Sequence, residues 1–287
     1  MGNGVFQEDW EVKLQARLDY PQNWKEVCNV IMTNNKLYNY PYMATVPAAV
    51  SLTRDTAFTW TANAITNEQL DVATPYVANT HIDVADMAQC RYENQMEYAD
   101  LFGKELNEQV ESAVLGNYAN CTDFDKDLMD TGTAGTTNIT VTTENIDNIC
   151  GALIREIREA NGGDLLNRNG AFIIWAAADY ELLESWARVN GYNTADDIIV
   201  NGIKVGTKYL GVEHYYSNKH TSRHLLGGVK KLFHVGILNA TYGKVDIVPF
   251  PAATSNLYSI GIASRIDYGI KVFANYRPLL FDIQCNA

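Results

Sequence analysis

The sequence predicts an α+β fold, in which long strands and one long helix lie beside a compact mixed domain. Hydrophobic and polar residues alternate over residues 50–60, 76–84 and 258–276, which is the two-residue period of strands. Small and aliphatic residues recur three and four positions apart over residues 96–113, the pattern of an amphipathic helix. An apolar run at residues 171–175 lies between two further helical patterns, as expected for a buried strand.

The composition is that of an ordinary soluble globular protein. The chain has 287 residues, of which 47% are hydrophobic and 20% are charged, and this is too apolar for a disordered chain. No apolar run approaches the roughly 20 residues that cross a bilayer, and the first residues lack the regions of a signal peptide. The cysteines are widely scattered, so we expect reduced thiols at Cys28, Cys90, Cys121, Cys150 and Cys285.

Charge is distributed unevenly along the chain, whose net charge is -12. Residues 1–203 hold 12 Lys and Arg against 30 Asp and Glu, whereas residues 204–287 hold 10 against 4. These opposite charges either pair within one molecule or let copies of the chain meet acidic face to basic face. Nucleic-acid binding is disfavoured because the longest basic run is only Lys230 and Lys231.

Residues 1–45 form the first segment, which is rich in aromatic residues and is interrupted by Pro21 and Pro41. One short helical pattern runs from Trp10 to Leu18, and no longer period follows it. We expect an arm that lies on another surface, which belongs either to the same chain or to a second copy.

Residues 46–84 are predicted to form an extended β-hairpin. Its strands are residues 50–60 and 76–84, and polar residues between 63 and 68 form the tip. Because an isolated two-stranded ribbon is only marginally stable in water, the hairpin must pack on something else.

The clearest helix covers residues 89–119, which contain no proline and show a single apolar face. About 30 helical residues correspond to a rod of roughly 45 Å. A coiled coil is the alternative explanation of this pattern, although Ala and Gly occupy several of the seam positions.

Residues 125–250 are predicted to form one compact domain. Its first helix begins near residues 142–144 and ends at Asn161, Gly162 and Gly163, which favour a left-handed C-cap. The other predicted elements are a strand at 171–175, a helix at 177–189 and short strands near 205, 211–216, 233–238 and 245–248. The final strand, residues 258–276, is unusually long and is predicted to bend at Gly269, so that it connects the other parts.

No group of residues forms a recognisable active site. His220 and His224 have the spacing of a helical metal site, but the glutamate of that motif is missing, and a solvated loop is the simpler explanation. The aspartates from Asp123 to Asp130 lack the glycine and the glutamate of a calcium loop. The sequence also lacks a glycine-rich phosphate loop and a nucleophile elbow. We therefore expect no catalytic, cofactor-binding or metal-binding residue.

The order of these elements resembles that of the major capsid proteins of tailed double-stranded DNA bacteriophages, the Hong Kong ninety-seven type capsid fold. The segments that carry the resemblance are residues 54–84 as the extended loop, 89–119 as the spine helix, 171–175 with 178–183, 203–206 with 211–217, and 264–272.

The resemblance implies a structural subunit of a shell, not an enzyme. In such a subunit, residues 1–45 are the N-terminal arm, 46–84 the extended loop, 85–125 and 250–287 the peripheral domain, and 126–249 the axial domain. The subunit would self-assemble into pentamers and hexamers of an icosahedral shell, located in the virion and, during assembly, in the host cytoplasm. Its partners would be further copies of the chain, a portal protein, a separate scaffolding protein and a decoration protein. Packaged DNA would be in non-specific proximity only, and no cofactor or membrane is implied.

The expected contacts between subunits lie on the predicted arm, loop, helix and final strand. They are Trp10, Trp24, Arg54, Phe58, Trp60, Tyr76, Glu97, Glu105, Arg265 and Lys271. No lysine occurs between Lys36 and Lys104, so the lysine-to-asparagine cross-link of some relatives is not expected.

Two alternatives remain at this point. An encapsulin is a nanocompartment shell of the same fold; encapsulins tend to begin with a helix, and residues 19–45 favour a phage protein instead. A hydrolase or a sugar-binding protein would be monomeric and would have a deep pocket with convergent polar groups.

Overall fold

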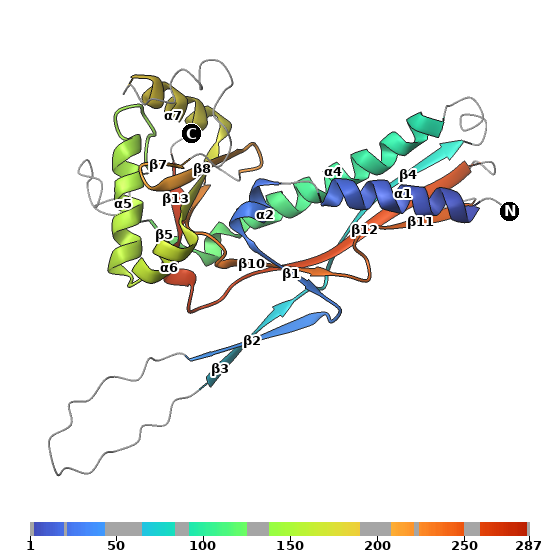
Figure 1. Cartoon of the computed structure of the whole chain (residues 1–287), viewed down its shortest axis with the longest axis horizontal. Coiled ribbons are helices and arrows are strands. Elements are labelled where there is room, and N and C mark those ends of the chain that lie inside the picture. Colours follow the sequence, from blue (N-terminus) through green and yellow to red (C-terminus); the bar gives the residue numbers. More distant parts are fainter. Residues whose placement is uncertain are drawn as a thin grey trace, which may run out of the picture.

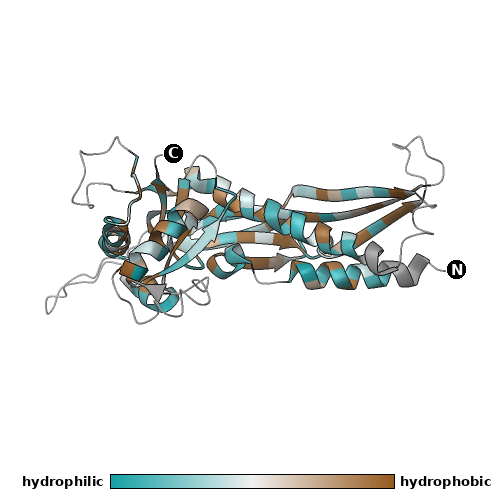
Figure 2. Ribbon diagram, turned by 90° about the horizontal axis from the view of Figure 1, so that it is seen from above, coloured by the Kyte–Doolittle hydropathy of each residue, from teal (hydrophilic) through white to brown (hydrophobic). Residues whose placement is uncertain are grey.

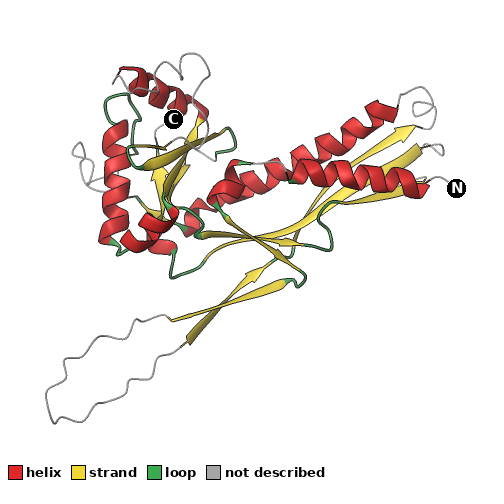
Figure 3. Ribbon diagram, in the orientation of Figure 1, coloured by secondary structure: helices red, strands yellow, loops and turns green. Residues whose placement is uncertain are grey.

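In its described part, the fold is built on three β-sheets and the helices that pack on them. The computed structural model describes residues 3–19, 22–43, 65–83, 92–124, 138–189, 208–220, 224–249 and 259–285. A five-stranded sheet runs through an elongated body, a six-stranded sheet lies in a compact end, and a two-stranded ribbon projects from the junction (Figure 1). Helices and strands are mixed along the chain, which confirms the predicted α+β class (Figure 3).

The elongated body is organised around the long strand β12, Ser259–Val272. Strand β4 (Thr74–Asp83) pairs antiparallel with one edge of β12. Strands β10 (Phe233–Leu238) and β11 (Lys244–Pro249) pair antiparallel with the other edge, one after the other. Strand β1 (Asn29–Thr33) completes this sheet by pairing parallel with β10.

The final strand is shorter than its alternating sequence predicts, because residues 274–276 form a turn. Within it, Gly269 lies opposite Gly236. A Cβ atom added to Gly269 would lie 1.9 Å from the carbonyl oxygen of Asp71, so the chain between β3 and β4 crosses β12 at this point. Glycine is required here because no side chain fits beneath the crossing backbone.

Two helices cover one face of this sheet. Helices α1 (Asn3–Leu18) and α4 (Tyr92–Gly116) lie side by side along the long strands (Figure 2). Helix α4 buries the predicted apolar stripe, on which Ala99, Leu106 and Val110 are at most 1% exposed. The prediction of a long amphipathic helix is therefore confirmed. Among the described residues, no helix is long and apolar enough to cross a membrane.

The segment predicted as an arm folds onto its own chain. Helix α1 packs against α4 and β11, and helix α2 (Asn23–Val27) then leads into β1 at the edge of the sheet. Trp10 and Leu14 are 3% and 0% exposed as a result. From the sequence, the arm was expected to lie either on its own chain or on a second copy. For the start of the arm, the structure shows that the covering surface belongs to the same chain.

The projecting ribbon is formed by strands other than those predicted. Strand β2 (Leu37–Met43) pairs antiparallel with β3 (Ile65–Asp71), whereas β4 belongs to the sheet of the body. The predicted polar tip is wrong in its second half, because the alternating side chains of β3 continue through Thr66 to Glu68. Residues 44–64, which include the predicted strand 50–60, lie outside the described residues.

The compact end contains the six-stranded sheet, in the order β5-β13-β9-β6-β8-β7. Helices α5 (Ile146–Glu159) and α7 (Ala177–Val189) pack on β9 and β6 respectively, and both were expected from the sequence. Helix α5 is followed by Asn161, whose φ of 58° is left-handed as predicted. The remaining elements are η1 (Asn117–Asn120), β5 (Thr122–Asp123), α6 (Gly163–Asn169), β6 (Ala171–Ala176), β7 (Lys208–Tyr209), β8 (Val212–Ser217), β9 (His224–Val229), η3 (Arg277–Leu279) and β13 (Leu280–Gln284).

The sheets divide the chain differently from the predicted domains. Strands β10 and β11 belong to the sheet of the body, although the sequence assigns residues 126–249 to the axial domain. Strand β13 belongs to the sheet of the compact end, although residues 250–287 are assigned to the peripheral domain. The reason is that an apolar pattern shows that a strand is buried but not which sheet buries it.

Buried residues form one continuous core that joins the body to the compact end. A separate, small core lies where the ribbon meets the body and contains Leu70, Val72, Leu238 and Phe273. The ribbon is therefore attached by its own packed joint.

Candidate subunit interfaces

The ribbon has one face that the described part of the chain leaves exposed. Leu37, Met43 and Ile65 are 51%, 58% and 68% exposed. Met43 and Ile65 are direct cross-strand neighbours, and because side chains alternate along each strand, Leu37 lies on the same face. We call this face the outer face; it consists of Leu37, Asn39, Pro41, Met43, Ile65, Asn67, Gln69 and Asp71.

The opposite face of the ribbon packs on the body through aromatic rings. Tyr40 stacks on Phe273 with 4.3 Å between ring centroids, and its hydroxyl lies 2.6 Å from that of Tyr276. His234 of β10 lies edge-on to Phe273, with ring centroids 4.7 Å apart. We call this joint the ribbon root; it consists of Tyr38, Tyr40, Leu70, Val72, His234, Leu238, Phe273 and Tyr276.

An ion pair and hydrogen bonds beside the ribbon root also connect the ribbon to the body. The Lys271 ammonium lies 3.3 Å from the Glu68 carboxylate and donates to the Gln69 carbonyl oxygen. Glu68 also accepts hydrogen bonds from the Tyr42 hydroxyl at 2.7 Å and the Ala274 backbone N–H at 3.1 Å. Burial alone would raise the pKa of Glu68, but these donors and the nearby ammonium together hold it below the ordinary value.

A groove between α4 and β4 forms a second partly apolar surface. Leu101 of α4 and Val77 of β4 line it and are 55% and 52% exposed. Phe102 and Ala78 are the other apolar residues of the lining. Charged and polar residues complete the lining: Asn79, Lys104, Glu105 and Glu108. In the part of the chain that the structure describes, β4 pairs only with β12, so its other edge retains unpaired backbone groups.

Two aromatic residues predicted as contacts between subunits are buried inside the chain. Trp10 is 3% exposed on α1, and Trp24 is 1% exposed on α2. The prediction for these two residues is corrected, because a side chain that its own core encloses has no surface left for a neighbour. Three others lie outside the described residues, namely Arg54, Phe58 and Trp60.

The remaining predicted contacts are surface residues in different environments. Tyr76 is 37% exposed and stacks on Tyr268 with 5.5 Å between centroids. Glu97 and Glu105 are exposed on α4, where Glu105 accepts a hydrogen bond from the Gln109 amide.

Both predicted basic contacts that lie within the described residues, Arg265 and Lys271, already have acidic partners within the chain. Arg265 binds Asp267 through two hydrogen bonds of 2.7 and 3.0 Å, and Lys271 pairs with Glu68. Part of the opposite charge noted in the sequence is therefore paired within one molecule.

Sequence reasoning missed the outer face of the ribbon. The alternation of tyrosines at positions 38, 40 and 42 was the available signal, because it assigns Leu37 and Met43 to the face opposite the tyrosines. Pro41 and the neighbouring asparagines obscured this short strand.

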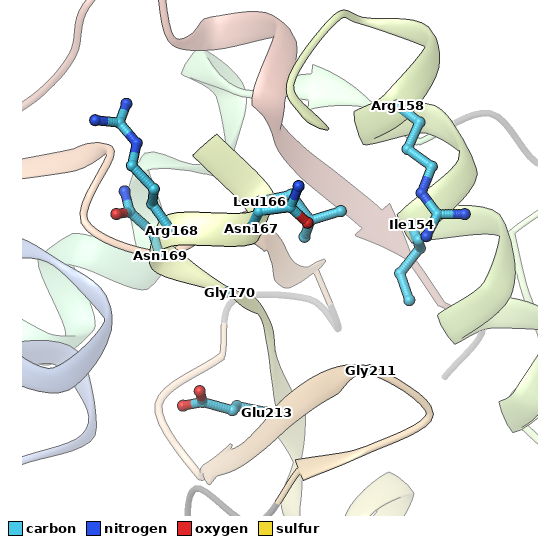
Figure 4. Close-up of a pocket in the computed structure, with 9 residues that line it drawn as sticks. All are labelled: Ile154, Arg158, Leu166, Asn167, Arg168, Asn169, Gly170, Gly211 and Glu213. Atoms are coloured by element: carbon cyan, nitrogen blue, oxygen red, sulfur yellow. The ribbon is translucent and has the colours of Figure 1, made fainter. Parts of the chain in front are cut away.

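The acidic residue that lines a pocket in the compact end, Glu213, is hydrogen-bonded to side chains of its own chain. The pocket in Figure 4 is lined by Arg158 and Glu213, among others. The Glu213 carboxylate accepts hydrogen bonds from Lys230 at 2.6 Å and from the Tyr215 hydroxyl at 3.0 Å. Among the described residues, no group of three His, Cys, Asp or Glu could hold a metal ion.

The two histidines predicted to lie in a solvated loop are packed instead. His224 begins β9, stacks on Tyr118 with 3.8 Å between centroids, and lies 2.8 Å from the buried carboxylate of Asp282. The Nδ1 atom of His220 lies 3.0 Å from the backbone carbonyl oxygen of His224. The solvated-loop interpretation is wrong for His224, because this residue lies on β9 opposite Gln284 of β13.

Comparison with known proteins gives a match at the level of structure. No family model and no curated protein sequence matches the chain. The capsid of Ralstonia phage GP4 is similar, with a TM-score of 0.59, 8% identity and coverage of 91% of this chain and 87% of that one. The capsid of cyanophage P-SCSP1u gives a TM-score of 0.55, 15% identity and coverage of 93% and 88%.

The chain has the Hong Kong ninety-seven type capsid fold. In this capsid fold, α4 corresponds to the expected spine helix. Strand β3 of the ribbon lies within residues 46–84, which were expected to form the extended loop, whereas β2 lies within the expected arm, residues 1–45. A virus-like particle from Pyrococcus furiosus is also similar, with a TM-score of 0.57, 10% identity and coverage of 97% of this chain and 99% of that one. The predicted capsid fold is therefore confirmed by similar structures that cover most of the chain.

Proposed function

We propose that the chain is the structural subunit of an icosahedral phage capsid shell that encloses a double-stranded DNA genome. The observation that carries the proposal is the outer face of the ribbon. A two-stranded ribbon is marginal on its own, and this one projects from the body with Met43 and Ile65 more than half exposed. A neighbouring copy supplies the missing cover.

The geometry favours a contact between different surfaces of two copies. The outer face lies on β2 and β3, whereas the groove lies between α4 and β4, so the two are different surfaces. In this proposal the ribbon of one copy covers the groove of the next. Exposed Leu101 and Val77 offer apolar area to the outer face. When the outer face of one copy binds the groove of the next, each of the two copies still has one of these surfaces available for a further copy. Repeating this contact by rotation closes the copies into rings and shells.

The proposal extends to the remaining parts of a virion. The partners are further copies in pentamers and hexamers, a portal protein, a separate scaffolding protein and a decoration protein. Assembly takes place in the host cytoplasm, and the finished shell is part of the virion. No catalytic activity is assigned to the chain, and many modest non-covalent contacts hold the shell together.

A nanocompartment shell of the encapsulin type is the second candidate. The observation that favours it is α1, because residues 3–18 form a helix of the kind with which encapsulins tend to begin. The preference for a phage protein from the sequence depended on an extended arm at residues 19–45. The similarity to the Pyrococcus furiosus virus-like particle supports the same candidate.

Electron microscopy of the purified full-length protein tests the proposal. We expect closed particles in negative stain and a matching fast-sedimenting species in ultracentrifugation. A protein that stays monomeric at all concentrations contradicts both shell candidates. Particles that package DNA in infected cells support the phage capsid, whereas particles that enclose a bound cargo enzyme support the nanocompartment.

A further inference from the structure

A buried histidine lies at the joint between ribbon and body. His234 is 4% exposed on β10. Three aromatic rings surround it: Phe273 at 4.7 Å, Tyr40 at 5.8 Å and Tyr276 at 5.8 Å between centroids. Since Tyr40 belongs to the ribbon and the other two rings follow β12, the imidazole touches both sides of the joint.

The hydrogen bonding of His234 defines which atom can take up a proton. Its Nδ1 atom lies 2.9 Å from the backbone carbonyl oxygen of Leu232. A carbonyl oxygen only accepts, so Nδ1 carries the hydrogen and Nε2 is the atom that a second proton would occupy. Burial lowers the pKa of His234, and the Leu232 carbonyl opposes this effect only in part.

Among the described residues, the charged groups that the strand pairing and the ion pairs place beside His234 do not compensate an imidazolium. Lys271 lies directly opposite His234 in the pairing of β10 with β12, and Glu68 of β3 is already paired with that lysine. On the other edge of β10, the residue opposite is the uncharged Asn29. Arg168 acts on Tyr276 from the compact end and has the same sign as Lys271.

Tyr276, which stacks on His234, stays neutral over the relevant pH range. Burial, followed by the hydrogen bond with Tyr40, raises the pKa of Tyr276 to about 12. A proton on His234 therefore adds an unpaired positive charge within a packed joint.

We propose that mild acid releases the ribbon from the body through protonation of His234. The proposal rests on the proposed function, because the ribbon that it frees is the one that covers a neighbouring subunit. Neutral His234 contributes its full stabilisation above the ordinary histidine pKa of about 6.5, and this contribution is lost as the pH falls below that value toward the lowered pKa. Attraction between the imidazolium and the faces of the aromatic rings opposes this loss of stability, and the joint would become more stable in acid if this attraction were the larger effect.

Hydrogen exchange of the unassembled full-length subunit at pH 7.5 and pH 5.5 tests the proposal. After correction for the intrinsic pH dependence of exchange, the amides of β2 and β3 should exchange faster at pH 5.5. The increase should approach about tenfold, which is the limit set by measuring one pH unit below the ordinary histidine pKa of about 6.5. The subunit is held below its assembly concentration, so the result does not depend on whether shells form.

Two variants complete the test. His234→Phe retains an aromatic ring and should remove the pH effect, whereas His81→Asn, which removes an exposed histidine on β4, should retain it. If His234→Phe does not fold, an NMR titration of the wild-type histidines serves instead and should place the pKa of His234 below that of free histidine. Unchanged exchange between the two pH values, slower exchange in acid, or an unshifted or raised pKa overturns the proposal.

Discussion

Replacing Gly269 with alanine tests how the ribbon is held on the body. The new Cβ atom would lie 1.9 Å from the Asp71 carbonyl oxygen, whereas real Cβ atoms essentially never approach closer than 3.0 Å, so the crossing backbone must move by at least about 1.1 Å. Overpacking usually costs about 1–3 kcal/mol. Because the obstacle is backbone and cannot rotate away, we expect about 3 kcal/mol of lost unfolding free energy, or an opened ribbon root.

Two other glycines provide matched comparisons for this variant. A Cβ atom at Gly236 would lie 2.6 Å from the Val72 side chain, which can adjust, so Gly236→Ala should cost less. A Cβ atom at Gly151 would meet nothing within 4 Å on helix α5, so Gly151→Ala should stabilise the protein by about 0.5–1 kcal/mol.

Denaturant unfolding of the unassembled subunit measures these differences, and hydrogen exchange of β3 shows whether the joint has opened. The expected order of stability is Gly151→Ala, wild type, Gly236→Ala, Gly269→Ala. If Gly269→Ala unfolds at the wild-type midpoint with unchanged exchange in β3, the crossing has been described wrongly.

Two further predictions concern charge and thiols. Glu68→Gln should lower the free energy of unfolding by about 1 kcal/mol at pH 7. Because the pKa of Glu68 is lowered in the fold, this difference from wild type should vanish as the pH falls below about 4.5 and through the lowered pKa. Denaturant unfolding of both proteins at pH 7 and at a pH below the lowered pKa measures the difference. Burial raises the pKa of Cys121 and Cys150 to about 12, so both thiols should stay unreactive toward a thiol reagent at pH 8 until the protein is denatured, and rapid labelling of either in the native protein would refute their burial.

Elements with an uninterrupted period were predicted well. The stripe of α4 and the alternation of β12 each continue through many residues, so a single burial pattern explains them. Strand β9 was missed because Gly227 and Gly228 look like a turn. In the fold these glycines let η3 and β13 approach closely, since a Cβ atom at Gly228 would lie 2.4 Å from the Leu279 carbonyl oxygen and 2.9 Å from the Leu280 Cα atom.

The candidate interfaces were harder to predict than the fold. Exposed and buried aromatic residues look alike in a sequence, so Trp10 and Trp24 suggested contacts with a neighbour although the chain itself covers them. Ion pairs between distant segments are equally invisible, and Lys271 was expected to face another subunit although it binds Glu68. Only the pairing of β2 with β3 reveals which apolar side chains lack cover.

The most direct measurement of the central claim is the sedimentation of a double variant, Met43→Thr with Ile65→Thr, which makes the outer face polar while keeping residues suited to strands. Val12→Thr on α1 is the matched control, because Val12 and Ile65 are both 68% exposed. We predict that the double variant folds as a stable single subunit that forms no particles, while the control assembles like wild type. Particles of normal size and yield from the double variant would contradict the claim that this face must be covered by another copy.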